Sequence, residues 1–341
     1  MKQTLQERFP RLFLHPQLSK WLTIQFHQGL APATIDAYAR ALLDYADFCR
    51  SLEVDFSVAQ REHIAAYVHN MASRPVGKGG VQQGLANATM RQRLVAVRLC
   101  YDYLVEEQLR DDNPIKRGVY TVNKGFAGSR RGLLPHHKRL PWIPDEEQWQ
   151  NIVTATDVEP LRNRLMLALA YDGALRREEL CLLHTGDFDI PYRLITLRAE
   201  TSKTRRSRVV HYSEATGQLY AMYLRQRFKT TKQGGLLFLS ESHRNEGSPL
   251  TKWTWSKVVH AIAARAGVSQ FTTHTLRHLR LTDLARAGLE LHEIATFAGH
   301  KSLDTTTLYI HLSGRELADK VSKGMNAIHI WRTATINNLP L

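Results

Sequence analysis

The sequence predicts a mainly α-helical protein, with an all-helical N-terminal domain and a mostly helical C-terminal domain that carries a small antiparallel β-sheet. Apolar residues recur at steps of three and four over most of the chain, which is typical of amphipathic helices. The 341 residues fit two domains, at roughly 150 residues per domain. A glycine-rich stretch without periodicity separates the two halves. We therefore expect domains at residues 1–112 and 141–341, joined by a linker at 113–140.

The N-terminal domain is predicted to contain three helices: Thr34–Arg50, Arg61–Met71 and Thr89–Gln108. The first has an apolar face, and Thr34 is its expected N-cap. The third has a similar face and is ended by a polar run that leads into Pro114. No strand pattern precedes residue 115, so this domain is expected to be entirely helical.

The linker is basic and contains no acidic residue. It is interpreted either as a solvated connection or as a segment that follows a phosphate backbone. Its positive residues are the candidates for DNA contact: Lys116, Arg117, Lys124, Arg130, Arg131, Lys138 and Arg139.

The C-terminal domain is predicted to alternate helices with one short sheet. The expected helices are Asp145–Ala155, Leu161–Tyr171, Glu214–Phe228, Lys252–Ala266, His274–Ala287, Leu291–Phe297, Thr305–Leu312 and the polar segment Glu316–Met325. The alternating segments Leu194–Arg198 and Arg208–Tyr212 predict two strands joined by a tight, basic turn.

Composition narrows the class of partner. A formal net charge of +14 and a pI near 9.8 favour a polyanion, with nucleic acid ahead of an anionic membrane surface. No apolar run approaches the roughly 20 residues of a membrane-spanning helix, and the polar first ten residues lack a signal-peptide core. Cys49, Cys100 and Cys181 show no metal-ligand spacing, so we expect reduced, buried thiols in a cytoplasmic protein.

Two arginine motifs could bind a phosphate. His274 and Arg277 are three residues apart and would share one helix face, where they can donate to the same anion. Arg176 opens a helix after Gly173, and Glu179 can hold its side chain. Each motif is also compatible with an ordinary helix start. Arg177 is a rival for the role of Arg176, with poorer geometry toward Glu179.

Three further residues stand out. Lys203 lies in the basic turn between the strands, where it is either solvated or inserted beside DNA. Tyr309 begins a polar helix with no apolar stripe to explain it, although an aromatic residue is by default part of a core. His274 and His278 have metal-ligand spacing, but no acidic residue lies between them to support a zinc site.

Taken in order, these segments resemble the tyrosine recombinase (phage integrase) family over residues 30 to 325. The matching positions are Arg176, Lys203, His274, Arg277, His300 and Tyr309, including Gly299-His300 nine residues before the tyrosine. The lysine segment departs from the family, which often has Gly-Lys-Gly where this chain has Ser-Lys-Thr, and Arg205 and Arg206 lie nearby as further DNA contacts. The linker is also longer than a minimal family linker.

The resemblance implies a helical core-binding domain, a catalytic domain and a reaction without metal, ATP or other cofactor. Tyr309 would attack a DNA phosphodiester to give a 3′-phosphotyrosine. Arg176 and Arg277 would bind the non-bridging oxygens, and Lys203 would protonate the leaving oxygen. His274 would assist proton transfer and His300 would hold the phosphate. The expected assembly is a homotetramer on two DNA duplexes, with the C-terminal tail exchanged between protomers.

Two other activities remain open. A type IB topoisomerase-like enzyme would use the same residues to relax DNA as a monomer. A catalytically silent DNA-binding protein could also use this fold. Relaxation of plasmid without a recombination site would indicate the first, and a covalent protein–DNA adduct would exclude the second.

Overall fold

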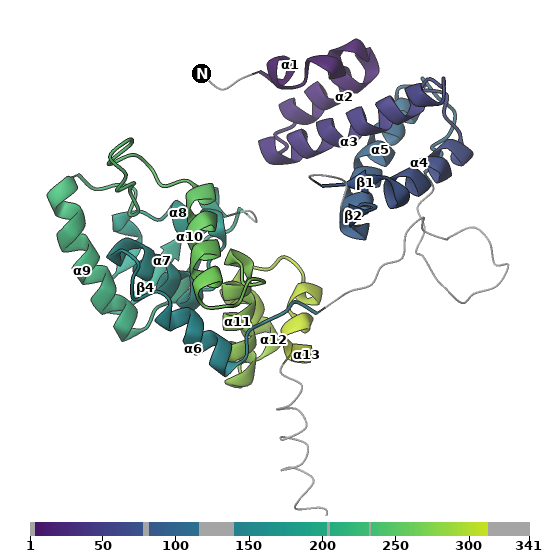
Figure 1. Ribbon diagram of the computed structural model, residues 1–341. Helices are drawn as coiled ribbons and strands as arrows, with labels where there is room; N and C mark the ends of the chain where they lie inside the picture. The colour runs from purple at the N-terminus through teal and green to yellow at the C-terminus, as the bar shows by residue number, and fades with distance from the viewer. Residues whose placement is uncertain (1–3, 78–81, 116–139, 203–204, 232, 313–341) are drawn as a thin grey trace, which may run out of the picture. The chain divides into compact units, whose positions relative to one another are not determined.

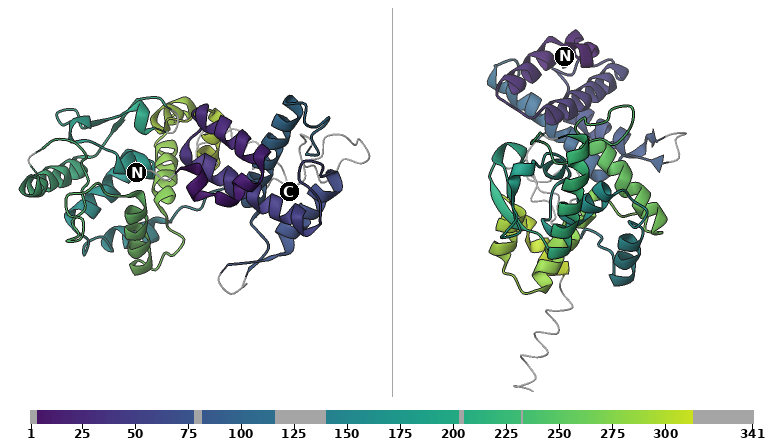
Figure 2. Two further views of the ribbon diagram at one scale, coloured as in Figure 1. Left: turned by 90° about the horizontal axis from the view of Figure 1, so that it is seen from above. Right: turned by 90° about the vertical axis from the view of Figure 1, so that its left-hand side faces the viewer.

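A computed structural model describes residues 4–77, 82–115, 140–202, 205–231 and 233–312. The chain divides into two compact units, Met1–Lys138 and Arg139–Leu341 (Figures 1 and 2). Both units are built mainly from helices, which confirms the predicted mainly α class. Residues 116–139, which make up most of the predicted linker, are not among the described residues. The predicted helix Glu316–Met325 also lies outside them.

The first unit is a set of helices around one apolar core. Its elements are α1 (Leu5–Arg8), the 3₁₀ turn η1 (Pro10–Leu14), α2 (Pro16–His27), α3 (Pro32–Ser51), α4 (Arg61–Ser73) and α5 (Asn87–Glu106). α3 packs against α5, and the apolar faces of both helices are buried. The three predicted helices are therefore confirmed.

The start of α3 differs from the prediction. The helix begins at Pro32, with Ala31 as N-cap, so the assignment of Thr34 as N-cap is wrong. Proline suits the first helical position because its fixed φ is already helical and its missing N–H would have no partner there. The helix α2 was not predicted, although its buried Leu18, Trp21 and Leu22 follow the helical spacing.

The first unit also contains a small hairpin, so the prediction that no strand precedes residue 115 is wrong. β1 (Pro75–Val76) pairs antiparallel with β2 (Gln82–Gln83). Two residues per strand are too few to show alternation, so no sequence pattern could reveal them. Gly84 follows β2 with a φ of +78°, and a Cβ there would lie 2.0 Å from the carbonyl oxygen of Ala72. This close approach explains the glycine.

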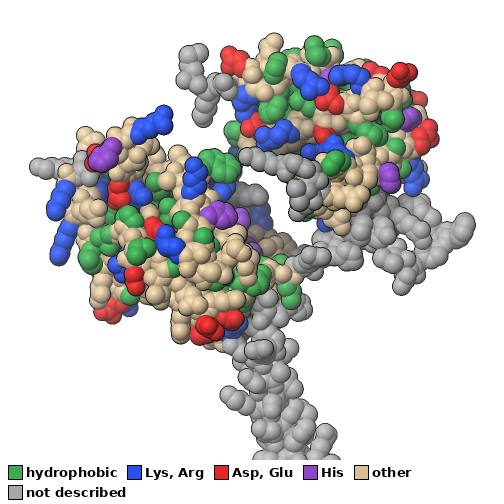
Figure 3. Space-filling model, viewed as in Figure 1, with side chains coloured by type: hydrophobic (Ala, Val, Ile, Leu, Met, Phe, Trp, Pro, Cys, Tyr) green, Lys and Arg blue, Asp and Glu red, His purple; other side chains and the backbone are tan. Residues whose placement is uncertain are grey.

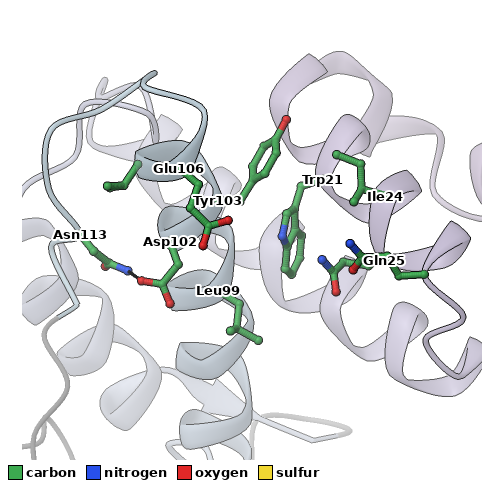
Figure 4. Close-up of a pocket in the computed structure, with 10 residues that line it drawn as sticks. Trp21, Ile24, Gln25, Leu99, Asp102, Tyr103, Glu106 and Asn113 are labelled. Carbon is green, nitrogen blue, oxygen red and sulfur yellow. Dashed lines mark hydrogen bonds between the residues drawn. The ribbon is translucent and has the colours of Figure 1, made fainter.

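A pocket of about 490 Å³ lies between α2 and α5 in the first unit (Figure 4). Trp21 and Ile24 line it from α2, and Leu99 and Asp102 line it from α5. Asp102 accepts a hydrogen bond of 2.7 Å from the side-chain amide of Asn113. The pocket contains none of the residues predicted to be catalytic.

The second unit combines helices with a three-stranded antiparallel sheet. Its helices are α6 (Glu146–Thr154), α7 (Leu161–Asp172), α8 (Arg177–Cys181), α9 (Glu214–Thr230), α10 (Lys252–Arg265), α11 (Thr273–Arg286), α12 (Leu291–Ala298) and α13 (Thr307–Leu312), with 3₁₀ turns η2 (Thr185–Asp187), η3 (Ala199–Thr201) and η4 (Leu303–Thr305). The strands β3 (Phe188–Asp189), β4 (Leu194–Leu197) and β5 (Arg208–His211) pair in that order. The predicted helices up to residue 312 and both predicted strands are present.

The sheet differs from the prediction in two respects. β3 was not predicted, and the connection from β4 to β5 is no tight turn, because it contains η3 and runs from residue 198 to 207. On either side of this connection, Leu197 of β4 pairs with Arg208 of β5. Lys203 lies in this connection but outside the described residues.

The core of the second unit lies between the sheet and the helices. Ile195 and Leu197 of β4 and Val210 of β5 are buried in it together with Trp255 of α10. All three cysteines are buried and free, as predicted. No helix within the described ranges is long and apolar enough to cross a membrane.

Candidate active site

Arg176 and Glu179 are held together at the start of α8. Asp172 ends α7, and the chain then turns through Ala174 with a φ of +46° before Arg176 takes the N-cap position. The backbone N–H of Arg176 donates to Glu179 at 2.9 Å, and its guanidinium donates to the same carboxylate at 2.7 Å. Arg176 also donates to the carbonyl of Gly299 at 3.3 Å. The predicted role of Glu179 as a support for Arg176 therefore fits the geometry.

Arg208 of β5 also binds Glu179, and it was not predicted as a site residue. It donates to both carboxylate oxygens of Glu179, at 2.9 and 2.7 Å, and its Nε donates to the carbonyl of Phe297 at 3.0 Å. The sequence contained an indication of this role. Arg208 lies two and four residues before the buried Val210 and Tyr212, so all three share one face of the strand. An arginine on the inward face of a strand is rarely buried without a partner, so its position indicates a paired side chain.

Glu179 is buried, with 1% of its side chain exposed. Burial favours its neutral form, but the guanidiniums of Arg208 and Arg176 outweigh that effect and hold its pKa at about 2. One carboxylate thus orients two arginines that come from the N-cap of α8 and from β5. The carboxylate connects the sheet to the predicted phosphate-binding residue.

Arg277 lies on α11 and is anchored by backbone carbonyls. It donates to Ala174 and to Ala298, each at 2.6 Å, and it lies 3.0 Å from Nε2 of His300. Burial and the charges of Arg176 and Arg208 lower its pKa to about 9, which leaves it charged at neutral pH. Three positive guanidiniums therefore surround one region without an equal number of acids, an arrangement suited to an anion.

The contacts of His300 fix its proton. A guanidinium can only donate, so Nε2 of His300 accepts from Arg277. Burial and the charges of Arg277 and Arg176 lower the pKa of His300 to about 4, so the ring is neutral near pH 7. Its proton is then on Nδ1, which donates to the hydroxyl of the buried Thr306 at 2.9 Å.

Tyr309 lies in an apolar cluster but has a polar partner. Its side chain is 2% exposed and packs with Leu281 of α11 and Ile294 of α12. Its hydroxyl is 3.1 Å from Nδ1 of His278, and its ring stacks on His300 with centroids 6.1 Å apart. The apolar surroundings were not predicted, because they come from α11 and α12 rather than from its own helix.

The structure brings Arg176, Arg277, His300 and Tyr309 together in one unit. His274 is exposed in the first turn of α11, one turn before His278. Arg177 does not compete with Arg176, since it donates to Ser256 at 2.9 Å and its guanidinium lies over the ring of Trp253.

Several predicted DNA contacts lie outside the described residues: Lys203 and the linker residues Lys116, Arg117, Lys124, Arg130, Arg131, Lys138 and Arg139. Arg205 and Arg206 are described and exposed. Lys, Arg and His side chains are visible on both units (Figure 3). No group of three or more His, Cys, Asp or Glu within the described ranges could hold a metal ion, and His278 is engaged with Tyr309.

Comparison with known proteins finds tyrosine recombinases. Residues 144–316 match the phage integrase family. The chain is 29% identical over 306 residues to tyrosine recombinase XerC of Pelotomaculum thermopropionicum, covering 86% of this chain and 92% of that protein. It is 27% identical over 312 residues to tyrosine recombinase XerD of Bradyrhizobium diazoefficiens, covering 86% and 91%.

Solved structures share the fold. XerH bound to its palindromic difH substrate has a TM-score of 0.64 at 21% identity, covering 84% of this chain and 79% of that one. The Tn1549 transposon integrase in complex with a circular intermediate DNA has a TM-score of 0.63 at 16% identity, covering 84% and 92%. The family match spans half of the chain and includes all six predicted catalytic positions, of which the structure describes five. This protein belongs to the phage integrase family, the tyrosine recombinases.

Proposed function

We propose that this protein is a site-specific DNA recombinase that cleaves and rejoins DNA strands through a 3′-phosphotyrosine on Tyr309. The observation that carries the proposal is the position of the Tyr309 phenol, stacked on His300 beside the arginine cluster of Arg176 and Arg277. A nucleophile next to fixed positive charge is the arrangement that phosphoryl transfer requires.

The arginines would stabilise the transition state. Negative charge grows on the non-bridging oxygens of the phosphate as Tyr309 attacks. Arg277 is held by two carbonyls and Arg176 by Glu179, so neither side chain needs to reorganise when the phosphate binds. Because the site is largely buried, these charges act in a medium of low polarity, where they are more effective than in water.

Tyr309 must lose its proton during attack. Burial raises the pKa of Tyr309, while Arg277 and Arg176 act in the opposite direction, so the phenol is protonated at neutral pH. His300 accepts from Arg277 in this state. To donate to a phosphate through Nε2, His300 must gain a proton on that nitrogen and give up the hydrogen bond from Arg277. The negative charge of a bound phosphate favours the protonated ring.

The proposed partner is double-stranded DNA. Solved relatives of the same fold are bound to DNA, among them XerH with difH and the Tn1549 integrase with circular intermediate DNA. Lys203 is proposed as the general acid for the leaving 5′ oxygen, and Arg205, Arg206 and the basic linker as backbone contacts. The proposed assembly is a homotetramer on two duplexes with tail exchange, acting in the cytoplasm.

The biological role proposed is the integration, transposition or resolution of a mobile element. No observation within the described residues favours topoisomerase-like relaxation or catalytic silence over recombination. Formation of a covalent protein–DNA adduct would exclude a catalytically silent DNA-binding protein. Relaxation of a plasmid that lacks a recombination site would indicate the topoisomerase-like activity instead.

The test is the substitution Tyr309→Phe, which removes the nucleophilic oxygen and keeps the ring in its apolar cluster. On a nicked suicide substrate, the variant should bind DNA normally and form no covalent adduct, as measured by denaturing electrophoresis. The wild-type reaction should survive EDTA, because the positive charges are built into the protein. A normal yield of adduct from the variant would overturn the assignment of Tyr309.

A further inference from the structure

His278 is the side chain within the described ranges that hydrogen-bonds the hydroxyl of Tyr309, at 3.1 Å from its Nδ1. The two residues come from different helices, α11 and α13, and are 31 positions apart. The contact is therefore a product of the fold. His278 directly follows Arg277, so the same turn of α11 presents one group to the predicted phosphate site and the next group to the predicted nucleophile.

The side chains that pack around the ring of Tyr309 are apolar. Leu281 and Leu284 of α11, with Ile294 and Ala298 of α12, surround the ring with apolar groups. A buried hydroxyl without a hydrogen bond is costly, so a polar group must meet it. An alcohol or an amide would satisfy the hydroxyl equally well. A histidine in addition can accept the proton.

His300 is the other imidazole beside Tyr309, but both of its ring nitrogens are engaged. Its Nε2 lies against Arg277 and its Nδ1 against Thr306. Its ring stacks on the face of Tyr309 and does not meet the hydroxyl. Of these two histidines, His278 is the one placed to take the phenolic proton.

We propose that His278 is a catalytic residue for strand transfer, with Nδ1 holding the Tyr309 hydroxyl and taking its proton as the oxygen attacks phosphorus. The inference rests on the proposed function, since it assumes Tyr309 as the nucleophile. The bond from Oη to phosphorus forms, the bond from phosphorus to the 5′ oxygen breaks, and the phenolic proton moves to Nδ1. The leaving oxygen takes its proton from the general acid. In rejoining, His278 returns the proton to the departing phenolate.

The charge state of His278 fits an acceptor. Burial, together with the nearby His274 and Arg277, lowers its pKa to about 4, so Nδ1 can be unprotonated near pH 7. The titratable groups around it are His274 and Arg277 on α11, Tyr309 on α13 and His300 after α12. A phosphodiester bound at Arg277 adds negative charge that offsets the arginine and makes the ring a stronger base at the moment of attack.

The first test is His278→Asn in the full chain, with adduct formation followed in a single turnover on the nicked substrate. The Asn side-chain oxygen reproduces the position of Nδ1 and still meets the hydroxyl, but it cannot take a proton. Loss of a general base lowers a rate by about 10²-fold or more, and we expect that loss with unchanged DNA binding. His292→Asn, an exposed histidine on α12, is the matched control and should react at the wild-type rate.

The second test separates a base from a merely structural partner. A substrate with sulfur in place of the 5′-bridging oxygen has a leaving group that needs no protonation. It should rescue a variant that lacks the general acid, and it should leave His278→Asn slow. The wild-type rate should fall as acid protonates His278, and this decline should be smaller in the variant, in which His300 still titrates in the same range. Replacing Tyr309 by the more acidic 3-fluorotyrosine should restore part of the rate of His278→Asn.

If thermal unfolding shows that His278→Asn is not folded, His278→Gln replaces it in the same assays. A folded variant of either kind that cleaves at the wild-type rate with the wild-type pH profile overturns the role of His278. Rescue by the sulfur substrate overturns it too, since the defect would then lie at the leaving group. If Tyr309→Phe also forms no adduct, the proposed function stands and only the role of His278 fails.

Discussion

Asp44 in the first unit and Glu179 in the second each accept hydrogen bonds from several elements, and the two acids differ in burial. In the first unit, Asp44 of α3 accepts from Tyr67 of α4 at 2.6 Å and pairs with Arg74 and Arg93. Its side chain is 21% exposed. In the second unit, Glu179 pairs with Arg176 and Arg208 and is 1% exposed.

The difference separates a structural network from one that reaches the candidate site. The partners of Asp44 tie α3, α4 and α5 together. The partners of Glu179 include Arg176, a predicted phosphate ligand, and through Arg208 the backbone at the end of α12, next to His300. Water can partly replace a lost partner of Asp44, whereas it cannot do so for Glu179. The same chemistry therefore stabilises one unit and also positions functional groups in the other.

The largest effect is expected from Glu179→Gln compared with Asp44→Asn. The first substitution leaves two arginines without their acid, and breaking a buried pair costs about 3–5 kcal/mol. The second should cost about 1–3 kcal/mol, because it removes a hydrogen-bonded partner at a more exposed site. Denaturant unfolding measures both free energies. Single-turnover cleavage should fall strongly in folded Glu179→Gln and stay near wild type in Asp44→Asn. Equal cleavage defects would contradict the division into two roles.

The next effect is the dependence of stability on pH. The free energy of unfolding should decline in two steps as the pH falls. The pKa of His278 and of His300 is lowered from 6.5 to about 4, so the unfolded chain binds protons that the folded chain does not. The pKa of Glu179 is lowered from 4.5 to about 2 in the same sense. Stability should thus be fully present above pH 6.5, decline toward pH 4 because of the histidines, and decline further below pH 4.5 because of Glu179.

Denaturant unfolding of the wild-type chain at pH 7, 5 and 3.5 measures these steps. The variant Glu179→Gln should keep the decline between pH 7 and 5 and show less of the decline below it. A free energy of unfolding that is constant from pH 7 to 4 would contradict the neutral state assigned to both histidines.

A smaller effect is expected from Arg208→Lys, with Arg74→Lys as its counterpart in the first unit. Lysine keeps the charge but loses the paired donors that match a carboxylate. We expect a cost of about 1–2 kcal/mol at Arg208 and less at the more exposed Arg74. Arg208→Lys should slow cleavage about tenfold without weakening DNA binding, since Arg176 would be less well oriented. The outcome that speaks against this role is wild-type cleavage by Arg208→Lys.

The smallest effect on stability is expected from a pair of glycine substitutions. Gly29 and Gly299 have φ values of +81° and +65°, where alanine is strained by about 1 kcal/mol. A Cβ at Gly29 meets nothing within 4 Å, whereas at Gly299 it lies 3.0 Å from Cδ of Arg208. Both variants should lose similar stability, but only Gly299→Ala should slow cleavage, because it displaces Arg208. Equal cleavage rates would mean that Arg208 adjusts without consequence.

The sequence by itself determined most of the helices, though not α2, together with the two longer strands and the order of the predicted site residues. These features depend on local periodicity and spacing, as with Arg176 three residues before Glu179 or His300 nine residues before Tyr309. The two-residue strands β1, β2 and β3 could not be predicted from the sequence, because so short a segment shows no alternation of apolar and polar residues.

Tertiary structure alone decided which partners from distant parts of the chain the site residues have. Arg208 meets Glu179 across 29 positions, and His278 meets Tyr309 across 31. Spacing on one helix predicts neighbours three or four residues apart, and it cannot predict which distant side chain a buried group will face. Burial then sets the charge of these groups: it raises the pKa of Tyr309 and lowers that of His278 and His300. The residue types were visible in the sequence, whereas their charge states and pairings depend on the packing of α11, α12 and α13.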